Sequence, residues 1–524
     1  MELHKRNIHR VSQKEKVICQ TTLDEDVIVP DVKADMESLI LDWAEVELEE
    51  NRLMGNRLLV RGSLLFRVLY HTQKNRMVDC VEGSIAFEET INVKDMSNED
   101  EIRVDWEMED LNVSMIHSRK LNIKALLTLT AIACGEEMEM VAIGAEGDHG
   151  IETASRQVDV AQLAVRMRDT YRVKEEVELS GNKPNIDQIL WYRLEPRGIE
   201  CRPLDGKLSI HGEMELFCIY KGEEEHVPLQ WLERSIPFSG SLEVPESSDE
   251  MVPEIRIRPI HRDVEAREDG DGERRQLSIE AVLEMEVQLY REERISFLDD
   301  IYSPGADVIL RNHPVTVDHL VVRNASKYKM TDTLKLGSGD KILQICHSDG
   351  SVKLEKIRPV PGGLDMEGAM CVDVLYVAAD DRSPVRSIRG VLPFSYQVET
   401  GDTGKTDPER WVYHVIPGLE QLSAMMLGNG ELEIKAVITL DSIVMDPVTI
   451  QTIENAQIVP MDPKKFDQMP GIVGYVVQKG DTLWKIAKKF YASVDNIKQI
   501  NGLTGDELMP GQKLLIIKET KNFV

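Results

Sequence analysis

The chain has 524 residues, 42% of them hydrophobic and 29% charged, which is enough apolar material for several globular cores. Its formal net charge of −30 opposes contact with phosphate backbones, so nucleic acid is not an expected partner. The N-terminus has charge but no apolar h-region, and no run of about 18 apolar residues occurs, so we expect neither a signal peptide nor a transmembrane helix. We therefore expect the protein to stay in the cytoplasm.

Three segments of the chain share one pattern. Each contains a glycine followed eight residues later by a tyrosine, then a phenylalanine, and later an L-x-I-x-A segment, at nearly constant offsets. The glycine–tyrosine pairs are Gly62 and Tyr70, Gly212 and Tyr220, Gly368 and Tyr376; the phenylalanines are Phe87, Phe238 and Phe394; the L-x-I-x-A segments are 121–125, 277–281 and 432–436. This order predicts three copies of one unit, at 1–150, 157–300 and 312–455.

These segments alternate apolar and polar residues with a period of two. Within 277–290, for example, Leu277, Ile279 and Ala281 begin one apolar face, which only Val282 and Tyr290 interrupt. Such alternation places the apolar side chains on one side of a strand. We therefore predict three mainly β, antiparallel domains that are sandwich-like or barrel-like, with the shared glycine at a bulge or a close backbone approach. The strand order, and any pairing between units, stays open.

A different pattern begins after a linker expected at 456–473. Residues 474–518 predict strand, helix, helix, strand, which is a small α+β module. Asp481 or Thr482 can cap the first helix, and Ser493 can cap the second. Turn residues at 300–315, including Pro304 and Gly305, indicate a further linker between the second and third units.

The C-terminal module resembles the LysM family. The matching residues are Y-x-V-x-K-G-D-T-L-W-x-I-A at 475–487, Asn501, and L-M-P-G-Q-K-L at 508–514. LysM modules typically bind N-acetylglucosamine polymers between two loops. Carried onto this sequence, the resemblance implies a ligand- or partner-binding site at Gly480, Asp481, Thr482, Leu483, Leu508, Met509 and Pro510. The alternative is that Asp481 and Thr482 only cap a helix, and that Leu483 and Pro510 only hold the loops together.

The module differs from the rest of the chain in charge. Residues 474–518 contain seven lysines and four acidic residues, which gives +3 and leaves −33 for the remainder. Lys485, Lys488 and Lys489 lie on the polar face of the first helix. They form either a solvated face or a patch for an acidic partner.

No catalytic constellation is expected. The sequence lacks H-E-x-x-H, G-x-S-x-G and paired C-x-x-C motifs, and its twelve histidines are scattered. Most of the seven cysteines lie in apolar, strand-like runs, and the cysteines are expected to be reduced. We therefore predict no catalytic residue, no metal site and no cofactor.

Repeated β units of about 150 residues, followed by LysM and without a signal peptide, resemble the SipL-like SPOCS-domain family of clostridia and other spore-forming Firmicutes. The resemblance implies a non-enzymatic scaffold in spore coat assembly, in the mother-cell cytoplasm at the forespore surface. It implies that the LysM module docks to a SpoIVA-like coat morphogenetic ATPase. The alternative is a cell-wall protein that binds peptidoglycan or chitin-type glycan and is associated with a wall hydrolase. Self-association of the repeats is compatible with the first reading.

Overall fold

The computed structural model describes residues 1–74, 77–147, 150–223, 229–336, 341–380, 383–401, 407–427, 430–461 and 470–517. Strands dominate these residues, and two short helices lie near the C-terminus. The prediction of a mainly β protein with a small α+β module is therefore confirmed. Residues 462–469 of the expected linker lie outside the described residues, as does residue 518 at the end of the expected module.

Each repeat is a sandwich of two three-stranded antiparallel sheets. In every repeat the first, last and fifth strands form one sheet, and the second, third and fourth strands form the other. Repeat 1 comprises β1 (Glu2–Ile28), β2 (Met36–Met54), β3 (Arg57–Thr72), β4 (Val78–Asn92), β5 (Glu101–His117) and β6 (Lys120–Glu146). Repeat 2 comprises β7 (Glu152–Glu178), β8 (Ile186–Leu204), β9 (Lys207–Gly222), β10 (Gln230–Glu243), β11 (Val252–Arg267) and β12 (Gln276–Tyr302). Repeat 3 comprises β13 (Asp307–Lys335), β14 (Ile342–Val360), β15 (Gly363–Ala378), β16 (Val385–Glu399), the short 3₁₀ helix η1 (Pro408–Arg410), β17 (Val412–Leu427) and β18 (Glu431–Val459).

The core of each repeat lies between its two sheets and follows the alternation seen in the sequence. In repeat 2, Leu277, Ile279 and Ala281 of β12 are fully buried against residues of β9 such as Leu216 and Tyr220. Equivalent clusters fill repeats 1 and 3. The alternating residues therefore form one buried face in each sheet, as the pattern predicts.

The glycine and phenylalanine shared by the repeats face each other across neighbouring strands. Gly62 pairs with Phe87, and the same pairing occurs in repeats 2 and 3. A register shift lies opposite the glycine, at Leu48/Glu50 in repeat 1. The glycine therefore lies opposite a bulge of the neighbouring strand and at a close approach, because a Cβ at position 62 would lie 2.5 Å from the Glu47 carbonyl oxygen and 2.9 Å from the Phe87 ring.

Replacing Gly62 with valine is expected to destabilise repeat 1 by about 1–3 kcal/mol, because the new side chain has to displace backbone as well as the ring of Phe87. The midpoint of chemical unfolding measures this loss. Gly181→Val is the matched control, since nothing lies within 4 Å of a Cβ at position 181. Equal midpoints for the two variants would contradict the prediction.

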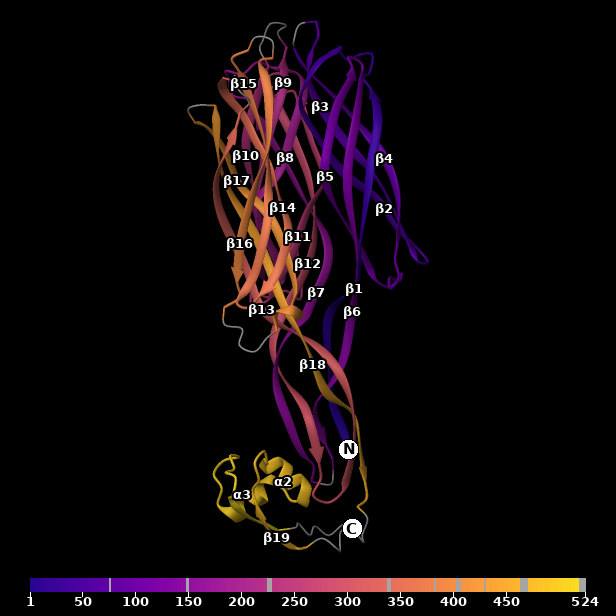
Figure 1. Ribbon diagram of the computed structural model, residues 1–524, viewed down its shortest axis with the longest axis vertical. Helices are drawn as coiled ribbons and strands as arrows, with labels where there is room; N and C mark the ends of the chain where they lie inside the picture. Colours follow the sequence, from indigo (N-terminus) through magenta and orange to yellow (C-terminus); the bar gives the residue numbers. More distant parts are fainter. Residues whose placement is uncertain are drawn as a thin grey trace.

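Six strands continue beyond the sandwiches and form a stalk (Figure 1). Three two-stranded ribbons twist together there, made by residues 2–13 with 134–146, 152–163 with 290–302, and 307–320 with 445–459. A register shift marks the start of each ribbon, at Gln13/Glu15, Leu289/Tyr290 and Leu320/Val322. Because a bulge bends a strand, these three shifts redirect the chains from sandwich to stalk.

The stalk has an apolar core of its own. It includes Ile8 of repeat 1, Phe297 of repeat 2 and Val317 of repeat 3, all almost completely buried. Arg10 of the first ribbon pairs with Asp318 of the third at 3.2 Å, and Arg6 pairs with Glu293 of the second at 2.6 Å. All three repeats therefore contribute to one stalk.

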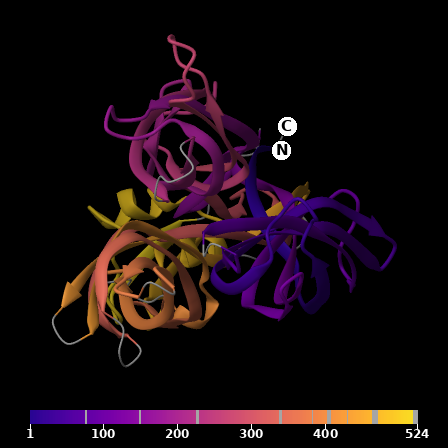
Figure 2. The same ribbon diagram turned by 90° about the horizontal axis from the view of Figure 1, so that it is seen from above.

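The three sandwiches surround a common axis, as the view from above shows (Figure 2). Their β2-, β8- and β14-containing sheets meet in an apolar cluster that includes Leu69, Trp191 and Leu375. The three repeats thus pack against one another in one body and are not independent domains joined only by linkers.

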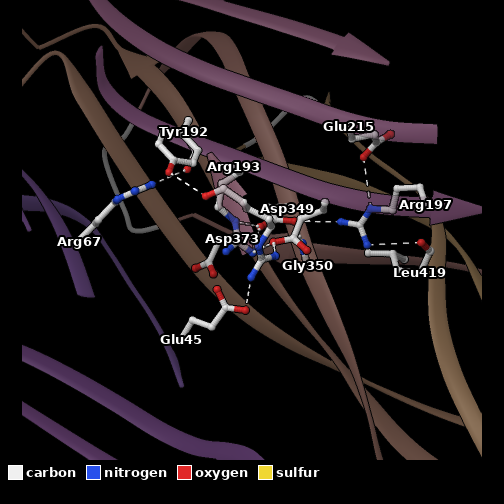
Figure 3. Close-up of polar contacts among 12 residues, drawn as sticks. Glu45, Arg67, Tyr192, Arg193, Arg197, Glu215, Asp349, Gly350, Asp373 and Leu419 are labelled. Carbon is white, nitrogen blue, oxygen red and sulfur yellow. Dashed lines mark hydrogen bonds and ion pairs between the residues drawn. The ribbon is translucent and has the colours of Figure 1, made fainter. Parts of the chain in front are cut away.

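A network of charged side chains crosses this junction (Figure 3). Asp349 of repeat 3 accepts from Arg193 at 2.6 Å and from Arg197 at 3.1 Å, both on β8 of repeat 2. Burial alone would raise the pKa of Asp349, but the positive charges of Arg193, His347 and Arg197 lower it overall. The side chain of Asp349 is 16% exposed, so one largely buried carboxylate is shared by two arginines of another repeat.

Repeat 1 joins the same network. Arg67 of β3 lies 3.9 Å above the ring of Tyr192 on β8 and donates to the Tyr192 carbonyl at 3.3 Å. Glu45 of β2 pairs with Arg262 of β11, which also pairs with Glu195 at 2.8 Å. Arginines therefore bridge repeat 2 to both of the other repeats (Figure 3).

Candidate functional site

The C-terminal module is a two-stranded sheet covered on one face by two helices. Its strands are β19 (Ile472–Val476) and β20 (Lys513–Ile517), and its helices are α2 (Leu483–Phe490) and α3 (Val494–Asn501). The Thr482 hydroxyl accepts from the Lys485 N–H at 3.2 Å, and the Ser493 hydroxyl accepts from the Asn496 N–H at 3.2 Å. Thr482 and Ser493 are thus the helix caps.

The two loops expected to bind a ligand differ in exposure. Gly480, Thr482, Met509 and Pro510 are exposed, and the Met509 side chain is 77% exposed. Asp481 and Leu508 are half-buried, whereas Leu483 is 2% exposed and packs in the module core. The accessible part of this surface is therefore formed by Gly480, Thr482, Met509 and Pro510, and Leu483 has a packing role.

Asp481 stabilises the first loop rather than a helix. Its carboxylate accepts from the Gln478 N–H at 2.8 Å and from the Tyr475 hydroxyl at 2.8 Å. The Gln478 N–H and the Tyr475 hydroxyl lower the pKa of Asp481 from its ordinary value. The loop is thus tied to β19 by an ionised carboxylate.

The module is clamped onto the end of the stalk, at the turn between β12 and β13 (Figure 1). The Tyr302 side chain is 4% exposed; its hydroxyl donates to the Ala492 carbonyl at 2.9 Å, and its ring meets Trp484 edge-on at 4.7 Å. The Trp484 indole N–H donates to Asp300 at 2.8 Å, and the Tyr491 hydroxyl donates to Asp307 at 2.7 Å. The module is therefore fixed to the stalk by contacts of helix α2 and of the turn that follows it.

The three lysines of the expected partner patch all have contacts within the chain. Lys488 pairs with Asp300 of the stalk at 2.5 Å, and Lys485 donates to the Gly480 carbonyl at 3.2 Å. Lys489 lies 5.4 Å from the ring of Tyr475 and 5.3 Å from that of Phe490. Lys488 thus contributes to the clamp, while Lys485 and Lys489 are exposed beside the first loop.

The clamp residues Asp300, Tyr302 and Asp307 were not singled out by the sequence. The turn residues around Pro304 indicated a linker at 300–315, but β12 continues to Tyr302 and β13 starts at Asp307. Pro304 and Gly305 therefore make a tight turn between two long strands. The local sequence signal for the clamp is therefore Tyr302, which lies between Asp300 and Asp307 beside this turn.

In the described regions, no group of three or more His, Cys, Asp or Glu side chains is placed to hold a metal ion. Burial raises the pKa of the Cys80, Cys201 and Cys218 thiols to about 12, so these thiols are neutral and unreactive near pH 7.

Comparison with known proteins identifies both parts of the chain. A family model described as SipL, SPOCS domain, matches residues 35–116, 185–267 and 341–427, one match in each repeat. A family model described as LysM domain matches residues 475–516. Both are non-catalytic binding domains. In the parts of the chain that the structure describes, no helix has the length and apolar character needed to cross a membrane.

Curated relatives match over short stretches. The chain is similar to a probable endopeptidase p60 of Listeria grayi, with 56% identity over 41 residues, 8% of each protein. It is similar to an autolysin of Enterococcus faecalis, with 44% identity over 46 residues, 9% of this chain and 6% of the autolysin. A Bacillus subtilis protein, YkzQ, is 45% identical over 42 residues, 8% of this chain and 56% of YkzQ. The chain therefore covers less than a tenth of the endopeptidase and the autolysin, and about half of YkzQ.

No solved structure matches the chain. The three SipL, SPOCS domain matches, one in each repeat, and the LysM match in the C-terminal module together cover more than half of the chain, which therefore belongs to the SipL-type SPOCS proteins, sporulation-related proteins that carry a LysM domain.

Proposed function

We propose that this protein is a non-enzymatic scaffold of spore coat assembly, which docks through its LysM module to a SpoIVA-like coat morphogenetic ATPase at the forespore surface in the mother-cell cytoplasm. The observation that carries the proposal is the clamp. The contact of Tyr302 with Trp484 and Ala492 fixes the module at the far end of a long body, so the module is held in one orientation.

The exposed loops suit a docking role. Met509, Thr482 and Pro510 lie on loops that the clamp does not use, because the stalk contacts Trp484, Lys488 and Tyr491 instead. The LysM module is also the basic part of an acidic chain, at +3 against −33. An acidic partner would therefore be steered to this end of the molecule.

Glycan binding is the second candidate. The specific observation in its favour is that the same loops, where LysM modules typically hold N-acetylglucosamine polymers, remain accessible at Met509 and Thr482. A glycan and a protein partner would compete for this surface.

Replacing Met509 with aspartate is expected to reduce co-purification of the coat ATPase with the full chain at least tenfold, because it places a charge at the centre of the accessible loops. Met138→Asp is the control, since Met138 is 60% exposed but lies on the stalk. The proposal would be contradicted if the Met509 variant bound the ATPase as well as the wild type does and the wild type bound chitin-type oligomers directly. Glycan binding would then be the better-supported function.

A further inference from the structure

Strand β19 has an open edge. Its sequence is IVGYV, and it pairs with β20 on one side only. The other edge of β20 is closed by a side chain, because the Asn501 amide accepts from the Leu515 N–H at 2.7 Å and donates to the Leu515 carbonyl at 2.7 Å. Asn501 therefore occupies the middle of the outer edge of β20, which leaves β19 as the more accessible edge of the sheet among the described residues.

The register identifies which backbone groups lie on that edge. The N–H and C=O of Leu515 face Asn501, so they point away from β19. Leu515 is the partner of Gly474, and opposing residues of an antiparallel pair either exchange both hydrogen bonds or face away from each other. The N–H and C=O of Ile472, Gly474 and Val476 therefore point outward. Within the described ranges, no backbone or side-chain group pairs with them.

The edge strands of the six sandwich sheets differ from β19. In the described residues, each of the twelve edge strands of the six sandwich sheets contains a β-bulge, a proline or several charged residues. Examples are Pro237 of β10, Pro393 of β16, and the three register shifts of β2. Such features prevent edge-to-edge pairing. β19 contains no proline, no charged residue and no bulge, so it lacks the protection that the described edge strands of the sandwiches have.

The strand is self-complementary about Gly474. If a second β19 pairs with it antiparallel about a two-fold axis through Gly474, Ile472 of each copy faces Val476 of the other. These side chains are 64% and 53% exposed, and Leu515 beside them is 42% exposed. Pairing would place each Ile472 beside the Val476 of the other copy, which partly shields both side chains, and it would satisfy the outward groups of three residues in each copy.

Charge favours the same arrangement. Lys513 is the cross-strand neighbour of Val476, and the two-fold axis puts the two copies of Lys513 at opposite corners of the joined sheet. The module is at the far end of the stalk, with β19 on the side away from the sandwiches (Figure 1). Pairing there keeps the two acidic bodies at opposite ends of the particle, where their repulsion is screened.

From these observations we propose that two copies of this chain associate tail to tail by antiparallel pairing of their β19 strands, which forms a continuous four-stranded sheet across two LysM modules. This association is independent of the coat ATPase and of any glycan.

The test is the mass of the full-length chain in solution as a function of concentration. The wild type is expected to convert from monomer to dimer between about 1 μM and 1 mM. Ile472→Lys is expected to raise the midpoint of this transition at least tenfold, because it places a charge on the edge. Ile18→Lys is the matched control, because Ile18 is 61% exposed on β1 of the body, and it should leave the midpoint unchanged.

A cross-linking experiment keeps the proposal falsifiable if the lysine variant folds poorly. In the proposed pair the two Gly474 Cα atoms lie about 5.5 Å apart, within the range that a disulfide spans. Gly474→Cys should therefore form a covalent dimer on mild oxidation, and Ile18→Cys should not. A monomer at all concentrations, or a dimer unchanged by Ile472→Lys, would overturn the proposal. A chain that stays monomeric while its β19 binds a strand of another protein would assign the edge to that protein and overturn self-pairing.

Discussion

Replacing Asp349 with alanine is expected to destabilise the three-repeat body by about 3 kcal/mol or more, because Arg193 and Arg197 lose a shared carboxylate in a largely buried position. Chemical unfolding of the full chain measures the loss. Asp159→Ala is the matched control, since Asp159 pairs with Arg294 at 2.7 Å in an exposed position and should contribute about 0–1 kcal/mol.

A second variant separates charge from packing. Replacing all three, as Arg193→Met, Arg197→Met and Asp349→Leu together, should restore most of the stability. Glu195 keeps its pair with Arg262, and Glu215, which loses Arg197, is 46% exposed and stays solvated. If the triple variant is as unstable as Asp349→Ala, the arginines have a role beyond this pairing.

The sign of the pH dependence follows from the lowered pKa of Asp349. A carboxylate whose folded pKa lies below its ordinary value of 3.8 stabilises the folded state above that value. This contribution is lost as the pH falls from the ordinary value through the folded one. Relative to the triple variant, the wild type should therefore lose free energy of unfolding as the pH falls through this acidic interval.

Replacing Tyr302 with alanine is expected to release the LysM module from the stalk. The substitution removes a buried ring that packs on Trp484 and a hydrogen bond to Ala492, a loss of about 3–5 kcal/mol in docking free energy. Released modules tumble independently, so their NMR signals should be much sharper than those of a 59.4 kDa particle.

Tyr302→Phe is the matched control for this prediction. It keeps the ring on Trp484 and loses only the hydrogen bond to the Ala492 carbonyl, at about 1 kcal/mol. The phenylalanine variant should therefore stay docked. Broad module signals in the alanine variant would show that Asp300 and Asp307 hold the module without the tyrosine.

Much of the fold could be predicted from the sequence, because it depends on patterns that repeat at fixed spacing. The nearly constant offset between Gly62 and Phe87 and their counterparts reflects a cross-strand pair, so it recurs wherever the same hairpin recurs. Tyr171 and Tyr328 also occupy equivalent places, each 5.8 Å from the repeat phenylalanine. Similarly, the sequence spaces four apolar residues of α2 at i, i+3, i+4 and i+7, which predicts one inward face of Leu483, Ile486, Ala487 and Phe490. The first three are buried and Phe490 is half-buried.

The stalk and the clamp could not be predicted in the same way. The stalk depends on register shifts such as Leu289/Tyr290, and such a shift changes which side of a strand is buried without changing its composition. This explains why Tyr290 interrupts the alternation and packs among stalk residues. The clamp joins Tyr302 to Trp484, 182 positions later in the sequence, and a contact between such distant residues leaves no local pattern.

The stalk has a consequence for the order of folding. The N-terminal residue of each ribbon pairs with the last strand of its own repeat, as Glu2 does with Glu146 and Asp307 with Val459. A ribbon therefore closes only when its whole repeat has emerged from the ribosome, and pairing over such sequence distances is slow. The turn that holds the LysM module lies between the second and third ribbons, so it becomes rigid only after both have formed. A docked module thus reports that the second and third ribbons have formed, and a chain that lacks either ribbon holds its module in no fixed orientation.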